Sequence, residues 1–214
     1  MKQNVIVMAT SKGGAGKSTL IRSLAAHWIN LGVKTGIIDA DPQGSVINRH
    51  DPEGLLKDLL VLAEPEESVS NLIESIKSEY SYLLVDTGGF RNRTTIRALI
   101  AADLALVPLK PSTDDMMGAI ETCNLIQELN ETPERVGRPI KYRMVITMSQ
   151  HGTVIARHVR QELESMGYLI LKSEMFHRVA YPETAIKGLA PSIVEPEGAA
   201  ARDIMGIVSE IIKL

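Results

Sequence analysis

The stretch SKGGAGKST, residues 11–19, lies between the apolar run NVIVMAT (4–10) and a helical pattern that starts near Lys17. Glycines let the backbone bend until its N–H groups point inward, and the N-terminus of the next helix adds further donors for phosphate oxygens. A lysine can then place its charge on the β and γ phosphates, and a hydroxyl can bind Mg²⁺. The stretch therefore predicts a nucleotide phosphate loop made of Gly13, Gly14, Ala15, Gly16, Lys17, Ser18 and Thr19.

Short apolar runs alternate with longer helical patterns beyond this loop. The candidate strands are residues 5–10, 35–41, 59–63, 82–87, 104–109, 142–148 and 168–175, and the candidate helices are 17–31, 67–79, 92–102, 114–130, 153–166 and 199–213. Nearly continuous apolar runs are typical of strands buried on both faces, and strand–helix alternation favours parallel pairing. We predict an α/β fold of P-loop type, a mainly parallel twisted sheet with helices on both faces, in one domain over residues 1–214.

The composition is that of an ordinary globular protein. Hydrophobic residues make up 44% and charged residues 23% of the 214 residues. Cys123 is the single cysteine, which excludes a disulfide framework and a cysteine-ligated metal cluster within one chain. No apolar run reaches the roughly 18 residues of a membrane span, and the N-terminal stretch indicates a buried strand rather than a signal peptide. We expect a cytoplasmic protein.

Charge is unevenly distributed along the chain. Residues 51–86 hold nine acids and two lysines, a local net charge of −7, whereas residues 133–178 hold eight Lys or Arg and four acids, a local net charge of +4. Such asymmetry can mark an interaction surface, and it can equally reflect two differently solvated faces.

The phosphate loop departs from the usual pattern at its start. Ser11 stands where a glycine is usual, and Lys12 follows it. The resulting pattern, K-G-G-x-G-K-[ST], resembles the deviant Walker A motif of the ParA/MinD family of P-loop ATPases. In that family the extra lysine reaches across a nucleotide-sandwich dimer to the phosphates held by the other subunit. The resemblance implies this role for Lys12, and it implies an ATP-dependent homodimer.

Carboxylates end two of the predicted strands. Asp39 and Asp41, in GIIDADPQGS (36–45), are two positions apart and so project from the same face of a strand. The segment resembles the family's D-x-D-P-Q switch segment, which implies that Asp41 orients or activates the attacking water and that Asp39 holds a Mg²⁺-bound water. Asp86 ends YLLVDTGG (82–89), the general form of a Walker B segment, and would contact Mg²⁺ through water.

The resemblance therefore implies ATP and Mg²⁺ as cofactors and assigns roles to the residues above. The implied catalytic residues are Lys12, Lys17 and Asp41, and the implied metal-binding residues are Ser18, Asp39 and Asp86. No N-K-x-D guanine-reading motif follows a strand, which argues against a GTPase. Residues 145–149 and 108–115 end two other predicted strands and are candidate contacts of the base and ribose.

The resemblance covers nearly the whole chain. Its C-terminal part, RVAYPETAIKGLAPSIVEPEGAAARDI (178–204), is similar in layout to the short ParA partition proteins that lack an N-terminal DNA-reading domain. This implies a slow ATPase that partitions DNA or positions cargo, binds DNA without sequence preference as an ATP-bound dimer on the nucleoid, and is released when an adaptor protein stimulates hydrolysis. The DNA-binding candidates are Arg157, Arg160, Arg178 and Lys187, with Arg202 less favoured.

Other members of this superfamily remain alternatives. A MinD-like membrane ATPase should end in a basic amphipathic helix, but the tail ARDIMGIVSEIIKL indicates a helix packed on the core. A metabolic ligase would need a small-substrate pocket that the sequence does not locate. A scaffold that binds ATP without hydrolysing it is opposed by the presence of Asp41.

Overall fold

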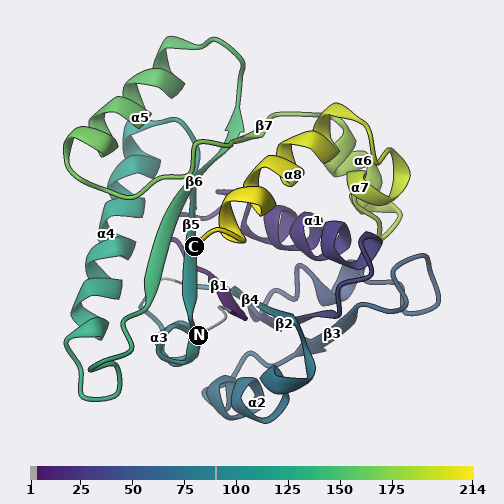
Figure 1. Ribbon diagram of the computed structural model, residues 1–214, viewed down its shortest axis with the longest axis horizontal. Coiled ribbons are helices and arrows are strands. Elements are labelled where there is room, and N and C mark those ends of the chain that lie inside the picture. The colour runs from purple at the N-terminus through teal and green to yellow at the C-terminus, as the bar shows by residue number, and fades with distance from the viewer. Residues whose placement is uncertain (1–3, 90) are drawn as a thin grey trace.

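The computed structural model describes residues 4–89 and 91–214. Seven parallel strands form a sheet in the order β3-β2-β4-β1-β5-β6-β7 (Figure 1). Their bounds are β1 Val5–Met8, β2 Thr35–Ala40, β3 Leu60–Ala63, β4 Tyr82–Thr87, β5 Leu104–Leu109, β6 Lys141–Ser149 and β7 Met175–Phe176. The predicted mainly parallel α/β fold is confirmed.

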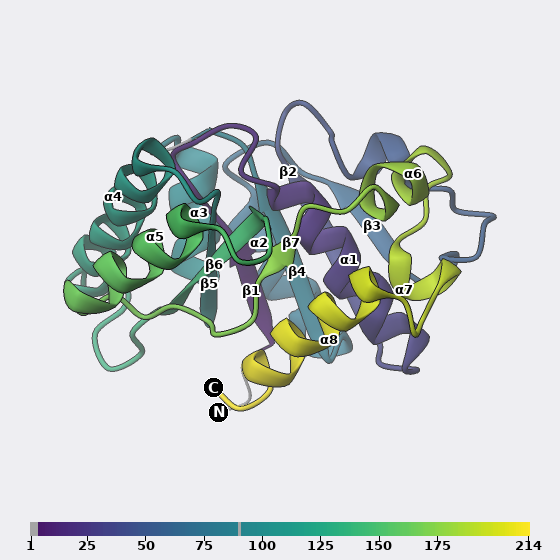
Figure 2. The ribbon, with the colours of Figure 1, turned by 90° about the horizontal axis from the view of Figure 1, so that it is seen from above.

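Helices cover both faces of this sheet (Figure 2). One layer holds α2 (Val69–Ile76), α3 (Arg93–Ala101), α4 (Thr113–Asn130) and α5 (Val154–Ser165), and the other holds α1 (Lys17–Asn30), α6 (Ala180–Ile186), α7 (Pro191–Val194) and α8 (Ala199–Ile211). Short 3₁₀ turns run over Ile47–Arg49 and Lys77–Glu79. Because successive strand residues point to opposite faces, Val5 and Val7 enter the first core, and Ile6 and Met8 enter the second.

The strand order places the phosphate loop at the centre of one sheet edge. β1 pairs with β4 on one side and with β5 on the other. The strands β2, β3 and β4 lie on one side of β1 and β5, β6 and β7 on the other, so the order of the strands reverses at β1. In open parallel sheets this crevice, outside the carboxyl ends of the strands, is where ligands bind. In register, Asp86 lies beside both Met8 and Asp39. The two acidic strand ends therefore flank the start of the loop.

The predicted strand over residues 168–175 is wrong for most of its length. Only a bridge from Ile170 to Met144 and the two residues of β7 pair with β6. Between this bridge and β7, side chains rather than a neighbouring strand bind the backbone. The Arg160 guanidinium donates to Leu171 O and Lys172 O. Glu210 also accepts the N–H groups of Lys172 and Ser173. The sequence analysis also did not predict α6 and α7.

The C-terminal helix packs as the sequence analysis expected. Ile204, Ile207, Val208 and Ile211 of α8 are buried against α1 and the sheet. Within residues 4–89 and 91–214, no helix combines the length and the apolar character that crossing a bilayer requires.

Candidate functional site

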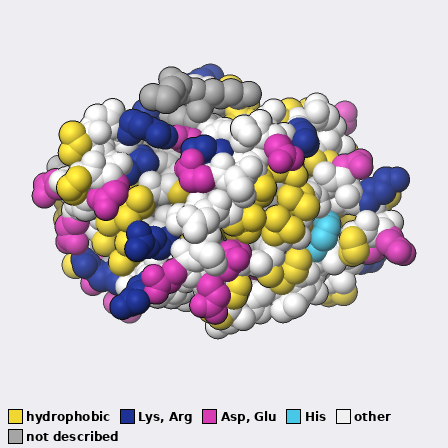
Figure 3. Space-filling model, turned by 90° about the horizontal axis from the view of Figure 1, so that it is seen from below, with side chains coloured by type: hydrophobic (Ala, Val, Ile, Leu, Met, Phe, Trp, Pro, Cys, Tyr) yellow, Lys and Arg dark blue, Asp and Glu magenta, His cyan; other side chains and the backbone are white. Residues whose placement is uncertain are grey.

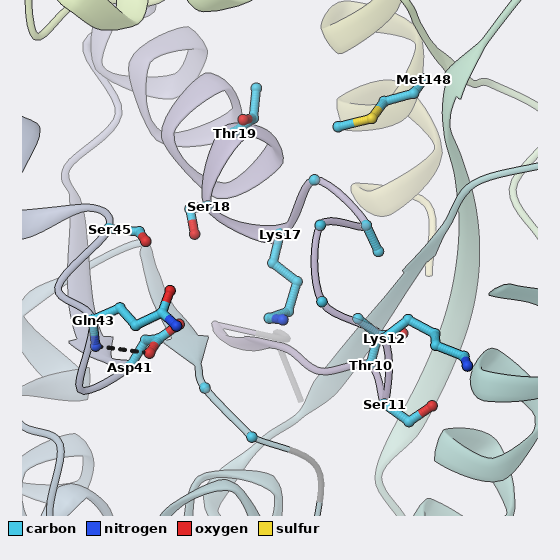
Figure 4. A pocket seen from close by; sticks show the side chains of 16 residues that line it. Thr10, Ser11, Lys12, Lys17, Ser18, Thr19, Asp41, Gln43, Ser45 and Met148 are labelled. Atoms are coloured by element: carbon cyan, nitrogen blue, oxygen red, sulfur yellow. Dashed lines mark hydrogen bonds between the residues drawn. The ribbon is translucent and has the colours of Figure 1, made fainter.

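A cleft of about 460 Å³ lies over the loop between β1 and α1 (Figure 4). Its lining contains every residue of the predicted phosphate loop, together with residues from three other strand ends: Thr10, Ser11, Lys12, Gly13, Gly14, Ala15, Gly16, Lys17, Ser18, Thr19, Asp41, Gln43, Ser45, Gly88, Gly89 and Met148. The tertiary structure thus brings the loop, the residues following β2 and β4, and the end of β6 into one cavity.

The backbone of the loop requires glycine at two positions. Gly14 (φ +72°) and Gly16 (φ +82°) both have left-handed conformations that side chains disfavour. Gly16 has a second constraint, because a Cβ there would lie 3.3 Å from the Met175 side chain. The loop is also tied to β6, since the Thr147 hydroxyl is 2.8 Å from Ala15 O. These constraints hold the loop open, with its N–H groups available to phosphate oxygens.

Lys17 and Ser18 begin α1 and face the cavity. In Figure 4 the Lys17 ammonium lies between the loop on one side and Asp41 and Gln43 on the other, and Ser18 lies beside Ser45. A cation and a hydroxyl at the N-terminus of a helix suit the phosphates and metal ion of a nucleotide.

Lys12 behaves differently from Lys17. Its side chain is exposed and points away from Lys17, toward the α4 side of the loop (Figure 4). Gly118 of α4 makes this placement possible, because a Cβ on Gly118 would overlap Ser11 Oγ and lie 2.8 Å from Lys12 Cγ. Thr122, one turn along α4, accepts a hydrogen bond from Ser11 N at 3.1 Å. Sequence reasoning missed Gly118 and Thr122, and no local pattern marks them.

Asp39 is buried and accepts three backbone hydrogen bonds. Its Oδ1 accepts from Asp41 N at 3.2 Å, and its Oδ2 accepts from Val46 N at 2.8 Å and from Ile47 N at 2.9 Å. The carboxylate therefore shapes the loop that carries Asp41, Gln43 and Ser45 into the cavity. Sequence analysis expected Asp39 to hold a Mg²⁺-bound water. The structure gives it a loop-holding role, which leaves one lone pair of Oδ1 for a water.

Asp86 is buried but is not satisfied. Neither carboxylate oxygen has a hydrogen bond of acceptable geometry within the described residues. The pKa of Asp86 is raised to about 7, mainly by burial and also by the charges of Asp39 and Asp41, while a hydrogen bond from the Ser18 hydroxyl and the charge of Lys17 act in the opposite direction. A buried carboxyl with no hydrogen bond of good geometry is a group that a cation would stabilise.

Asp41 lies at the rim of the cavity and is partly exposed. Its Oδ1 accepts a hydrogen bond from Gln43 N at 2.9 Å. The loop after β4 packs directly against it, because a Cβ on Gly88 would lie 3.1 Å from both Asp41 Oδ1 and Pro42 Cδ. The loops after β2 and β4, which both line the cavity, are therefore in contact.

The residues present fit a magnesium ion. In residues 4–89 and 91–214 no three His, Cys, Asp or Glu side chains gather as a metal cage. Mg²⁺ does not need one, because it usually keeps several waters and binds one or two carboxylates together with phosphate oxygens. The unsatisfied Asp86 carboxyl and the Ser18 hydroxyl supply oxygen donors of the required kind.

A second groove of about 550 Å³ continues from the cavity past Ser18, Thr19, Ser45 and Met148, which line both. Its apolar lining comes mainly from β7 and α6, and Arg22, Arg49, His177 and Arg178 also line it. Met148 was a candidate base contact within 145–149, and the structure places it at the junction. Residues 108–115 line neither space.

The candidate DNA-binding residues fall into two groups, those that are exposed and those that form ion pairs within the chain. Arg157, Lys187 and Arg202 are exposed, although the Arg202 guanidinium donates to Glu197 O. Arg160 pairs with Glu174 at 2.8 Å, and Arg178 pairs with Asp203 at 2.6 Å. The charges of this second pair of arginines are therefore compensated within the chain.

The family model of the CobQ/CobB/MinD/ParA nucleotide binding domain matches residues 6–191. Protein ParA of Rhizobium radiobacter is 29% identical over 184 residues, which are 83% of this chain and 80% of that protein. The maintenance of carboxysome distribution protein A of Halothiobacillus neapolitanus is 23% identical over 99% of this chain and 97% of its own length.

Solved structures share the fold at low sequence identity. The cell division ATPase MinD of Pyrococcus furiosus superposes with a TM-score of 0.78, at 16% identity, over 100% of this chain and 99% of that chain. The septum site-determining protein MinD of Pyrococcus horikoshii, complexed with Mg-ADP, gives a TM-score of 0.77 at 14% identity over 97% and 95%. The sheet and its helix layers are therefore those of known nucleotide-binding proteins.

Proposed function

Because the chain belongs to the CobQ/CobB/MinD/ParA family of nucleotide-binding domains, we propose that it is a ParA-type ATPase that dimerises on ATP and positions DNA or another cargo. The observation that carries the proposal is the pair of lysines on one loop: Lys17 faces the cavity, while Lys12 lines its rim, is exposed and points away from Lys17. One lysine serves the subunit's own nucleotide, and the other is free to serve a partner's.

Within one subunit, the loop and Lys17 bind the β and γ phosphates, and Ser18 and Asp86 hold Mg²⁺ directly or through water. When bound, the ion neutralises phosphate charge and orients the phosphate chain. Lys17 also stabilises charge on the transferred group, since it is fixed at the cavity wall by the first turn of α1. These groups prepare the γ-phosphorus for attack by water, which yields ADP and phosphate.

Asp41 orients the attacking water. It lies on the side of the cavity opposite the loop, with Lys17 between them (Figure 4). Asp39 acts as a positioning residue, because its three backbone hydrogen bonds hold the segment that carries Asp41. The contact of Gly88 with Asp41 and Pro42 then lets the loop after β4 respond to the same phosphate.

The apolar groove favours adenine over guanine as the base. A protein that selects guanine must supply an acceptor for its ring N–H and exocyclic amine, and a carboxylate is the usual one. No Asp or Glu lines the groove within the described residues. The groove instead offers the Met148 and Met175 side chains, which suit the flat face of a purine.

Dimerisation on ATP follows from the charge of Lys12. Two subunits that face each other's triphosphates need positive charge at their joint, and an exposed lysine beside each phosphate loop provides it. With ADP this attraction falls, because the terminal phosphate is gone. The nucleotide thus controls the oligomeric state.

DNA binding and adaptor control complete the proposal. Non-specific binding needs Lys and Arg on one face, and a dimer presents each such patch twice. On the face that Figure 3 shows, Lys and Arg are interspersed with Asp and Glu, so a single-sign patch is not there. One relative is named for the maintenance of carboxysome distribution, so a protein cargo fits as well as DNA.

A salt-titrated DNA-binding assay with ATP, ADP and no nucleotide tests this function. We expect binding of random-sequence duplex only with ATP, at protein concentrations that also give a dimer, and a steep loss with added salt. Anionic lipid vesicles in place of DNA test the MinD-like alternative. Vesicle binding with ATP, together with no DNA binding, would refute the partition function.

A further inference from the structure

A third cavity, of about 290 Å³, lies between the N-terminus of α5 and the segment before β7. We call it the α5 cleft. It shares no residue with the nucleotide cavity, and of the apolar groove it shares only Phe176. Its lining includes Ser149, Thr153, Arg157, Arg160, Lys172 and Glu174.

We propose that the α5 cleft binds a backbone phosphate of DNA and is the anchoring point of the DNA interface in each subunit. This inference rests on the proposed function, because it names the place where that function meets DNA. Sequence reasoning grouped Arg157 and Arg160 by helical spacing. The structure adds Lys172, Ser149 and an uncapped helix N-terminus around the same cavity.

The helix N-terminus at the cleft has unused donors. α5 is 12 residues long and begins at Val154, and its N-cap Thr153 makes no side-chain hydrogen bond to the first turn. The Thr153 hydroxyl is turned instead to Gln150 O, at 3.0 Å. The first N–H groups of a helix attract anions when no side chain caps them.

Ser149 supplies an independent sign of a ligand. It lines the cleft, is 1% exposed, and its hydroxyl has no hydrogen-bond partner within the described residues. A buried hydroxyl without a partner costs free energy, so native structures usually satisfy it. A phosphate oxygen in the cleft would provide the missing partner.

The charge of the cleft favours an anion. Arg157, Arg160 and Lys172 oppose one carboxylate, Glu174, and His151 also lines the cavity. Arg160 is fixed by Glu174 and by the carbonyls of Leu171 and Lys172. Arg157 and Lys172 are exposed and take part in none of the ion pairs of the described residues. One cation is therefore preorganised, and two are available to the phosphate.

A phosphodiester strand suits this cleft better than a free phosphate. A water molecule takes about 30 Å³ in the liquid, so a cavity of about 290 Å³ has room for a phosphate and part of its sugars. The two available cations are exposed and can contact neighbouring phosphates of the same strand. A dimer carries two such clefts, and linked contacts raise the affinity for a polymer but not for single ions.

The test measures how the affinity of the full-length protein for a random-sequence duplex depends on salt, with saturating ATP. Each lost phosphate contact lowers the salt slope by about 0.9, so Arg157→Gln or Lys172→Gln should lower it by about 2 per dimer and weaken binding several-fold. Arg97→Gln is the matched control, because Arg97 is an exposed arginine of α3 outside the cleft. Dimer formation is measured for every variant.

Glu174→Gln should change DNA affinity in the opposite direction from Arg157→Gln and Lys172→Gln, which a merely structural effect would not do. It keeps a hydrogen-bond acceptor for Arg160 but removes the only carboxylate lining the cleft in the described chain, so DNA affinity and salt slope should both rise. Unchanged DNA binding in all three cleft variants, or weaker binding in Glu174→Gln, would overturn the inference. If the unaltered protein binds DNA and these variants do not differ from it, the inference about the α5 cleft is refuted and the proposed function stands. If the unaltered protein binds no DNA, the proposed function is refuted.

Discussion

Asp39 and Asp86 lie side by side in the register of β2 and β4, yet their carboxylates differ in hydrogen bonding. Asp39 accepts three backbone N–H groups, while Asp86 accepts no hydrogen bond of good geometry from the described residues and has only the Ser18 hydroxyl nearby as a donor and Lys17 as a compensating charge. The first therefore stabilises the fold of the switch loop without a ligand. The buried Asp86 carboxylate destabilises the nucleotide-free chain, and a bound metal ion would remove this cost.

Asp86→Asn should stabilise the metal-free protein at high pH. The pKa of Asp86 is about 7 in the folded chain and 3.8 as its ordinary value. Between these values the folded state keeps a proton that the unfolded state has lost, so the free energy of unfolding falls as pH rises, by at most about 1.4 kcal/mol per pH unit. Asparagine abolishes this dependence. Urea unfolding in EDTA at pH 5 to 8, followed by the fluorescence of Trp28, measures it.

Asp58→Asn is the control for that series, because Asp58 is exposed. It should leave the pH dependence intact. A steep fall in stability between pH 5 and 7 that persists in Asp86→Asn would contradict the assignment of the defect to Asp86.

Lys17→Ala should remove most of the nucleotide affinity. A hydrogen bond to a charged group contributes about 1.5–3 kcal/mol, so the loss should be on the order of 10- to 100-fold for ATP and for ADP. Calorimetric titration of both nucleotides checks this. Retention of full affinity would mean that the loop does not bind the phosphates.

Lys12→Ala should separate binding from assembly. Because the side chain is exposed at the rim of the cavity and points away from Lys17, ATP affinity should change by less than about 3-fold while the ATP-induced dimer is lost. Light scattering with ATP and with ADP measures the mass, and Lys57→Ala serves as an exposed-lysine control. An ATP-dependent dimer in Lys12→Ala would disprove the role across the interface.

Asp41→Ala should slow hydrolysis without preventing ATP binding. Loss of a positioned carboxylate that handles the attacking water typically costs about 10²–10⁴ in rate. The ATP-bound dimer should therefore accumulate and persist, and single-turnover phosphate release gives the rate. Normal turnover in this variant, with Asp58→Ala as the exposed control, would assign the water to another group.

Gly118→Ala should damage the phosphate loop from a distance. The added Cβ would overlap Ser11 Oγ and lie 2.8 Å from Lys12 Cγ, so these two side chains must move, and the start of the loop is displaced with them. We expect ATP affinity to fall by about 10-fold or more with little change in the far-ultraviolet circular dichroism, since loop misplacement of a few tenths of an ångström disturbs several phosphate contacts together. Met117→Ala, at the exposed neighbouring position, should keep the affinity. Equal affinity in Gly118→Ala and the unaltered protein would show that α4 does not seat the loop.

Sequence alone determined the fold class and the phosphate end of the site. The loop residues are contiguous, and their chemistry depends on backbone conformations that glycine spacing encodes locally. Parallel strands also bring their carboxyl ends to one edge, so the positions of Asp39, Asp41 and Asp86 near the loop followed from strand prediction alone. These inferences needed no knowledge of distant contacts.

Only the tertiary structure decided which polar groups have partners. Residues far apart in the chain decide how Lys12 packs on Gly118. The three hydrogen bonds to Asp39 and the lack of a well-formed partner for Asp86 likewise depend on the folded loop and on burial. The same holds for residues 168–175, where Arg160 and Glu210 bind the backbone in place of a neighbouring strand. The hydrogen-bond and ion-pair partners of a long side chain depend on which groups lie near it in space. The pattern of residue types along the chain does not give those distances.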